Sequence, residues 1–481
     1  MIGLLTVLLP AVGAPVVRMK PARSKALGFL ISIAVLDAAI CTWLATSMAP
    51  DTSVAIFQDF FVIDATSRLF LLLINLVFLG IATYIWSRLG AEPALQGGIE
   101  RYVGFALAFV AASNLAILSN HLIAMWIFLE ATTLAAVPLI QHGGHHSARR
   151  ASWKYFLFSG VGLSLAFLGF LCIGRSIELS GAHEVTFFFD GLTQAVQGAN
   201  DLWRRLGLVL VFLGFGTKLG LAPMYSWLPD TYDAAPPATT ALLAVAQFNV
   251  ALVGVLRVLQ VFRAADRDMV SLELVGLGLA TMAVSAFNII AAKNYKKLIA
   301  YAALNHGGVI AVGLGIGKSA AYGVVLYAIS NAFIKVILFL TAGKIRSHYK
   351  TGQISEVSGL IKDLPYSGLF FMIGTFALLG FPPFGSFLGE LIIMSALVGG
   401  GYVLVFAAFS VILTVTFVAT GRAIFPMIWG EPRKKADWGS QPVATIIPKL
   451  VFLIALVAMG IYLPAPVNNL LRQVAIGLGA P

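Results

Sequence analysis

Long apolar segments follow one another along almost the whole chain, and they limit its fold more than any other feature. A helix needs about 20 apolar residues to cross the ~30 Å hydrocarbon layer of a membrane. The 481 residues are 59% hydrophobic and 11% charged, whereas soluble domains carry about 25% charged residues. Because so few charges cannot cover a water-exposed surface, a soluble enzyme, a nucleic-acid-binding protein and a disordered protein are excluded. We predict an all-α polytopic protein embedded in the lipid bilayer.

About fourteen apolar segments are separated by polar residues, and each is a candidate transmembrane helix. They cover residues 2–17, 26–48, 69–86, 102–118, 122–140, 155–173, 206–228, 238–261, 271–292, 298–316, 320–342, 367–398, 402–428 and 446–463. The first segment precedes the first positive charges, which is the reverse of a secretory signal. We therefore expect a retained first helix that starts on the outer side.

The basic residues predict the orientation of these helices. Twenty of the 32 Lys and Arg residues fall in one set of alternate loops and eight in the opposite set. Cytoplasmic loops carry an excess of positive charge, so the first set is expected to face the cytoplasm and both termini the outer side. The remaining four basic residues lie inside apolar segments: Lys218, Arg257, Lys335 and Arg422. For Arg257 and Arg422, close to helix ends, we expect the side chain to reach the membrane interface.

The sequence predicts no cofactor or metal of its own. The two cysteines, Cys41 and Cys172, lie in separate apolar segments and cannot form an iron–sulfur or Cys-rich zinc site. No phosphate-binding GxxxxGK[ST] motif is present in the sequence, so the chain itself does not use ATP for transport. Any redox chemistry must belong to a partner chain.

Two of the segments contain proline in positions that predict broken helices. Pro223 lies in GTKLGLAPMYSWLPD, and Pro382 and Pro383 lie in LLGFPPFGSFLGELII. Proline removes a backbone donor, and a freed carbonyl at membrane depth must be buried in protein or face water. Paired breaks of this kind mark transport sites near the middle of the membrane. The alternative is that each proline only kinks its helix.

Five ionisable residues inside or at the edge of the apolar segments are candidate proton carriers. A charge near the membrane centre costs at least ~2.5 kcal/mol on insertion scales, so each ionisable residue there is expected to have a structural or functional role. Burial brings the charged and neutral forms of lysine and glutamate closer in free energy near neutral pH, which suits proton transfer. The alternative is a static ion pair that only braces the helices. The five are Glu130, Lys218, His306, Lys335 and Glu390.

Four stretches together resemble the antiporter-like subunits of respiratory complex I, Mrp cation/proton antiporters and membrane-bound hydrogenases. They are LEATTL around Glu130, KLGLAPMYSWLPDTYDAAP from Lys218, KKLIAYAALNHGG from Lys296 and GFPPFGSFLGE ending at Glu390. The sequence is most similar to the hydrogenase-4 component F branch of group 4 hydrogenase and formate hydrogenlyase complexes.

This resemblance implies fourteen helices, with helices four to eight and nine to thirteen forming two inverted repeats whose seventh and twelfth helices are broken. The corresponding parts are residues 1–100, 101–262, 263–430 and 431–481. It also implies that Glu130 pairs with Lys218, that Lys335 belongs to the same hydrated polar axis, and that Glu390 lies at the outer exit.

The sequence departs from the family pattern in three places. An eighth-helix position that is often His or Lys is Ala244, with Gln247 a turn later, and the eleventh-helix histidine one turn before Lys335 is Asn331. We also expect no long lateral helix after the fourteenth. The first two changes leave open whether water or Gln247 completes the relay.

The function implied is proton translocation by a subunit of a redox-driven complex I-like membrane complex, in a bacterial or archaeal cell membrane. The expected partners are other membrane subunits and a peripheral redox arm. Three alternatives stay open: an Mrp-type Na⁺/H⁺ antiporter subunit, a membrane subunit of an inorganic-carbon-uptake complex, and a structural anchor that conducts nothing.

Overall fold

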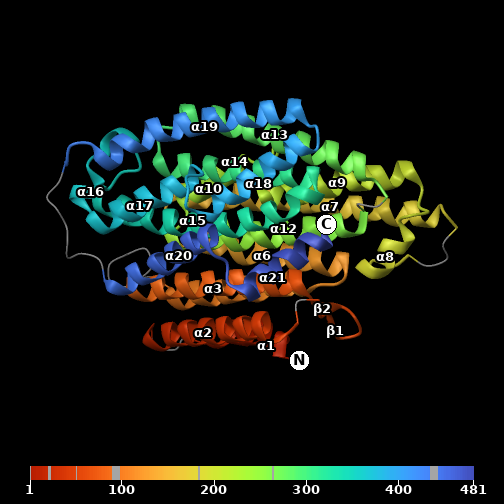
Figure 1. The fold of residues 1–481 in the computed structure, drawn as a ribbon. Coiled ribbons are helices and arrows are strands. Elements are labelled where there is room, and N and C mark those ends of the chain that lie inside the picture. The colour runs from red at the N-terminus through yellow and green to blue at the C-terminus, as the bar shows by residue number, and fades with distance from the viewer. Residues whose placement is uncertain are drawn as a thin grey trace.

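The structure, a computed structural model, describes residues 2–19, 23–49, 51–88, 98–142, 144–181, 185–262, 265–433 and 442–480. Long helices run side by side through one bundle, with α1 and α2 at one edge and α13 and α19 at the opposite edge (Figure 1). The N-terminal half comprises α1 (Ile2–Arg18), α2 (Arg23–Ser47), α3 (Ala65–Arg88), α5 (Ile99–Leu118), α6 (Leu122–Gln141), α7 (His146–Glu178), α8 (Phe189–Ala195), α9 (Asp201–Leu219), α10 (Trp227–Ala234), α11 (Pro237–Leu242), the π-helix η1 (Leu243–Gln247) and α12 (Phe248–Phe262).

The C-terminal half is also helical. It comprises α13 (Arg267–Ala291), α14 (Tyr295–Ile316), η2 (Lys318–Ala320), α15 (Ala321–Tyr349), η3 (Ile354–Glu356), α16 (Leu360–Asp363), α17 (Pro365–Leu378), α18 (Gly385–Gly399), α19 (Val403–Trp429), α20 (Val443–Ile461) and α21 (Ala465–Gly477). Among the described residues, eleven helical stretches are long and apolar enough to cross a membrane, and α1, α17 and α18 are shorter apolar helices.

Each of the fourteen predicted segments corresponds to one helix or to consecutive helices, so the prediction of a helical membrane fold is confirmed. The seventh segment is α9 with α10, the eighth is α11, η1 and α12, and the twelfth is α17 with α18. Four of the basic residues that predict the orientation lie outside the described residues: Lys20, Arg263, Lys434 and Lys435.

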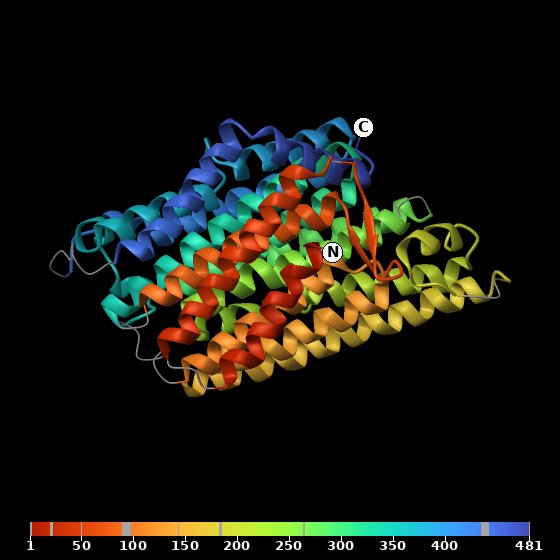
Figure 2. The same cartoon turned by 90° about the horizontal axis from the view of Figure 1, so that it is seen from below.

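A β-hairpin at one end of the bundle is an element that the hydrophobic segments did not predict. Strands β1 (Val54–Ile56) and β2 (Phe61–Ile63) pair antiparallel, and Phe61 also bridges to Ser119 at the end of α5. The start of α1 lies beside β2, and the C-terminal helix α21 packs against α2 and α3 (Figure 2). Both ends of the described chain therefore lie at the hairpin end of the bundle.

The two predicted breaks share one local pattern, G-x-x-P. Gly220 and Gly380 both have positive φ, 78° and 71°, which a glycine adopts without the steric cost of a Cβ. Pro223 and Pro383 follow three residues later. Each pair ends one helix and turns the chain before the next begins, so both segments are interrupted rather than only kinked.

Side chains satisfy the backbone groups that each break exposes, as a membrane interior requires. At the first break, Trp227 Nε1 donates to the Thr217 carbonyl (2.9 Å) and the Ala222 N–H donates to Thr281 Oγ1 (2.9 Å). At the second, Ser386 Oγ donates to the Ala377 carbonyl (2.8 Å). Thr217 and Ala377 both lie three residues before the break glycine, so the two breaks are stabilised at equivalent positions.

Glycine pairs let helices approach closely. A Cβ built on Gly169 of α7 would lie 2.6 Å from the Gly207 carbonyl oxygen of α9, and one on Gly278 of α13 would lie 2.7 Å from the Gly308 carbonyl oxygen of α14. Helices in a membrane gain little from apolar burial and associate through close packing of small residues. These contacts hold α7 to α9 and α13 to α14.

Arg257, which was expected to reach the membrane interface, is buried in the protein and binds a carboxylate at the start of α3. Its side chain is 6% exposed, and its guanidinium binds Asp64 through two bonds of 2.6 and 3.0 Å. Asp64 lies just before α3 and also accepts the Ser67 N–H (2.8 Å). Burial alone would raise the pKa of Asp64, but Arg257 and Ser67 hold it below its ordinary value. The partner lies 193 residues away in the chain, so the sequence pattern around Arg257 could not reveal it.

Replacing Asp64 tests whether this pair stabilises the fold. Asp64→Asn keeps a side chain that can accept the Ser67 N–H but leaves a buried guanidinium without its counter-charge, which costs about 3 kcal/mol. We expect a clear fall in the unfolding temperature of the detergent-purified protein. Glu178→Gln, which breaks the exposed Arg175–Glu178 pair, is the control and costs less than ~1 kcal/mol. Equal effects of the two variants would contradict this role.

Candidate ion-translocation site

The first break positions Lys218, which lies in the last turn of α9 and is 1% exposed. Its Nζ donates to Thr133 Oγ1 of α6 and lies 3.5 Å from the Tyr155 hydroxyl of α7. The hydroxyls replace the water that a lysine needs, and both can share a proton with it. Three helices thus hold one buried amine at the end of a broken helix.

Glu130 lies on α6, one turn before Thr133, and is only partly buried. Its Oε2 has no hydrogen-bond partner. Among the described side chains, no ion pair joins Glu130 to Lys218; the Thr133 hydroxyl is the group that contacts the lysine. The carboxylate lies on α6 one turn from Thr133, the residue to which Lys218 donates. The predicted pair is therefore brought together without direct contact.

Gln247 continues the contacts from the first break. Its Oε1 accepts hydrogen bonds from the Tyr155 hydroxyl (2.9 Å) and from Thr132 Oγ1 (3.2 Å). Gln247 is the last residue of the π-helix η1, and Ala244, the residue at the family's His or Lys position, is fully buried in the same segment. The eighth segment thus carries an alanine at position 244 and a buried amide, Gln247, one turn later.

One face of α15 carries the polar groups of the second half. Tyr327, Asn331 and Lys335 are spaced four residues apart, so they lie on one stripe of the helix. Lys335 is 2% exposed, and its Nζ lies 3.8 Å from the centroid of the Phe248 ring at the start of α12. Neither side-chain polar atom of Asn331 has a hydrogen-bond partner. The stripe leads from Lys335 toward the second break.

His306 and Glu390 lie where the stripe meets that break. His306 Nδ1 shares a hydrogen bond with the Tyr327 hydroxyl. His306 and Glu390 both line a small cavity of about 20 Å³, which is enough for roughly one water. A Cβ built on Gly380 would lie 3.0 Å from Glu390 Oε2, so the carboxylate lies over the backbone of the break.

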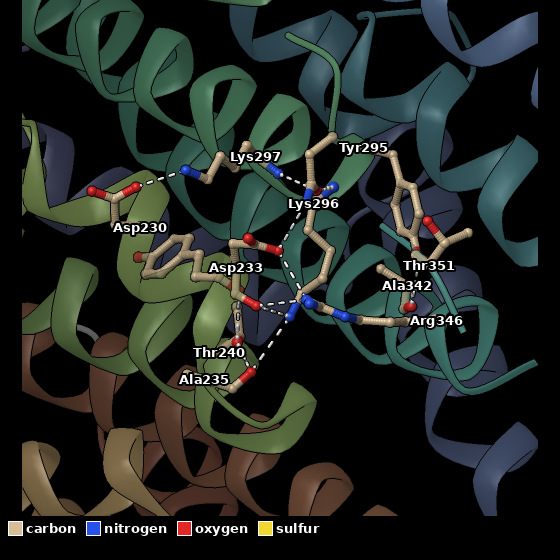
Figure 3. Close-up of polar contacts among 12 residues, drawn as sticks. Asp230, Asp233, Ala235, Thr240, Tyr295, Lys296, Lys297, Ala342, Arg346 and Thr351 are labelled. Carbon is tan, nitrogen blue, oxygen red and sulfur yellow. Dashed lines mark hydrogen bonds and ion pairs between the residues drawn. The ribbon is translucent and has the colours of Figure 1, made fainter. Parts of the chain in front are cut away.

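A cluster of charges around α10 was not among the predicted residues. Asp230 binds Lys154 of α7 (2.7 Å) and Lys297 of α14 (2.8 Å). Asp233 binds Arg346 of α15 (2.9 Å), and its carbonyl accepts from Lys296 (2.8 Å), as Figure 3 shows. A cavity of about 290 Å³ adjoins the cluster. Both aspartates lie in a stretch that carried the family resemblance, but these partners are 63 to 113 residues distant, beyond any local pattern.

Two further buried groups lie away from this line of contacts. Asp37 of α2 is fully buried and neither of its carboxyl oxygens has a hydrogen-bond partner. Lys449 is one of the twenty basic residues assigned to the first set of loops, although it falls within the apolar segment 446–463; it lies inside α20, where it is 1% exposed and 5.1 Å from the Phe370 ring centroid. Its assignment to a loop is wrong, because its helix begins at Val443.

Known proteins match both the sequence and the fold. The family model "NADH:quinone oxidoreductase/Mrp antiporter, TM" matches residues 119–416, which include all five candidate proton carriers. "Hydrogenase-4 component F homolog" of Methylacidiphilum infernorum is 28% identical over 416 residues, covering 84% of this chain and 86% of that protein. A Na(+)/H(+) antiporter subunit of Bacillus subtilis is 27% identical over 361 residues, covering 75% and 71%.

A solved structure shares the fold over nearly the whole length. A chain of the membrane-bound sulfane sulfur reductase, an archaeal respiratory membrane complex, superimposes with a TM-score of 0.88 at 23% identity, covering 99% of this chain and 98% of that one. The predicted resemblance is confirmed. The chain belongs to the NADH:quinone oxidoreductase/Mrp antiporter transmembrane family and is one of its antiporter-like membrane subunits.

Proposed function

We propose that this subunit translocates protons in a redox-driven complex I-like membrane complex, such as a group 4 hydrogenase or formate hydrogenlyase. The observation that supports the proposal best is the line of polar groups between the two broken helices. It runs from Lys218 through Tyr155 and Gln247, and from Lys335 along α15 to His306 and Glu390.

The proposed route runs from the cytoplasm to the outer side. Protons enter near the α10 cluster, reach Lys218 under the control of Glu130, pass Lys335 and His306, and leave by Glu390. In this orientation the hairpin end, which carries both described ends of the chain, faces outward. The excess of basic residues in the opposite loops supports it.

The interaction free energies at Lys218 are comparable with the free energy needed to move a proton across the membrane. Moving one proton against 100 mV requires ~2.3 kcal/mol. A hydrogen bond to a charged group contributes about 1.5–3 kcal/mol, so making or breaking the bond from Lys218 to Thr133 changes the free energy of the charged lysine by a comparable amount. A movement of Glu130 toward or away from Lys218 would also change the free energy of the charged lysine. Electron transfer in a partner arm drives the movement.

Two inverted repeats, residues 101–262 and 263–430, are part of this proposal. The shared G-x-x-P breaks and the side-chain bonds at equivalent carbonyls support them. Residues 1–100 and 431–481 then flank the repeats.

An Mrp-type antiporter subunit is the second candidate, and the similarity to the Bacillus subtilis antiporter protein favours it. Partnership with an inorganic-carbon-uptake protein and a purely structural role are weaker candidates, since neither explains a line of buried ionisable groups.

Lys218→Ala tests the proposed relay. In inverted membrane vesicles given hydrogen or formate, we expect proton movement to fall below about a tenth of wild type, because the route loses the amine that accepts the proton. Proton movement is followed with a pH-sensitive dye, and electron transfer is measured in parallel. Lys449→Met, which also removes a buried lysine but lies off the route, is the matched control and keeps proton movement. Normal proton movement in Lys218→Ala would contradict the relay.

Sodium separates the two leading candidates. For a redox-driven proton carrier, we expect the same proton movement in vesicles prepared with potassium salts alone as in vesicles with sodium. An antiporter exchanging Na⁺ for H⁺ would instead lose proton movement without sodium and regain it when sodium is added after a pH gradient is set. That second result would favour the Mrp-type function.

A further inference from the structure

The π-helix η1 marks the point where the two halves of the polar line approach each other. It interrupts an otherwise α-helical span from Pro237 to Phe262 and ends at Gln247, which is 1% exposed. Short π segments inside α-helices are frequent at functional sites, because the extra residue rotates the side chains that follow. Here the segment presents Gln247 toward Tyr155 and places Phe248 beneath Lys335.

The hydrogen bonds of Gln247 leave one side of the amide unused. Tyr155 donates to Oε1, and the Thr132 hydroxyl, whose proton is shared with the Leu129 carbonyl (2.6 Å), lies 3.2 Å from it, whereas Nε2 is buried and has no partner. A buried amide with two free N–H groups is unfavourable unless something accepts them. The Gln247 side chain is therefore held through its Oε1 by Tyr155 and Thr132, which lie near Lys218, while its Nε2 donors have no acceptor.

Unused polar atoms also lie on the facing helix. α15 packs directly against η1, and both Oδ1 and Nδ2 of Asn331 are buried without a partner. Lys335, one turn further along the same stripe, has an aromatic ring beside its Nζ instead of an acid. Donors from Gln247 and both a donor and an acceptor from Asn331 are what a buried water needs for its hydrogen bonds.

We propose that Gln247 and Asn331 bind water between Lys218 and Lys335, and that this water carries the proton across the middle of the subunit. The inference rests on the proposed function and identifies how this chain completes the step that the family often assigns to a titratable residue. Lys218 in its ammonium form gives a proton to the water, and the water gives one to the neutral amine of Lys335. Only N–H and O–H bonds form and break, and the two amides are unchanged at the end.

The amides act here as positioning residues. Neither can hold a charge near neutral pH, so no proton rests between the two lysines. The ionisable groups connected to the site are then Glu130, Tyr155, Lys218 and Lys335, each from a different helix. The proton therefore passes from Lys218 through the water to Lys335 without an intermediate titratable group.

Gln247→Met tests the inference, because methionine has a similar length but cannot hold the water. In the intact complex in vesicles, we expect proton movement to fall about tenfold, similar to the loss of a transition-state hydrogen bond of ordinary strength, while electron transfer persists. Asn331→Leu, from the other side of the site, gives the same loss and serves if Gln247→Met does not assemble. Gln141→Met, which removes an amide at the far end of α6, is the control and keeps proton movement.

A rescue variant distinguishes positioning from packing. Gln247→His restores hydrogen bonding and adds a titratable group, so we expect proton movement to return with a new pH-dependent step absent from the wild type. Full proton movement in both Gln247→Met and Asn331→Leu, with none in Lys218→Ala, would overturn this inference and leave the proposed function standing. Full movement in Lys218→Ala as well would overturn both.

Discussion

A membrane interior offers no water to a polar group, and this constraint governs where the chain can place charge. Two helices are interrupted by the same G-x-x-P pattern. The backbone groups freed at each break form hydrogen bonds with side chains of nearby helices. The lysine at the first break is bound by hydroxyls, and the glutamate at the second lies over the backbone of Gly380. Lys218 and Glu390 therefore lie where the breaks bring hydroxyl and backbone groups beside them.

The two halves of the polar line differ in how completely their groups are bonded. Lys218 has two hydroxyl neighbours and connects through Tyr155 to Gln247. Lys335 has the Phe248 ring, and Asn331 has no partner. Lys218 is thus held by hydroxyl groups, whereas Lys335 lies beside an aromatic ring and one turn from an amide that has no hydrogen-bond partner. The α10 cluster connects the two halves, since Asp230, on the second part of the broken seventh segment, binds helices of both proposed repeats, α7 and α14.

Much of this molecule could be predicted from the sequence, because segment length and proline position are local signals. The fourteen segments, the breaks at Pro223 and Pro383, and the buried position of Lys218 follow from apolar runs and their interruptions. Contacts between distant residues could not be predicted: Arg257 was expected at the interface but pairs with Asp64, and the partners of Asp230 lie on two other helices. The hairpin is too short to show strand alternation. The π segment Leu243–Gln247 has the same apolar composition as the α-helix around it, so only the structure reveals it.

If protons pass through this subunit, one wetted line joins the ionisable groups of the two broken helices. A cryo-electron microscopy map of the assembled complex, at a resolution that shows ordered water, tests it most directly. We expect water density in contact with Gln247 Nε2 and Asn331, and more between Glu390 and His306 in the cavity they share. A dry interior, with apolar side chains closing the space between Lys218 and Lys335, would contradict it.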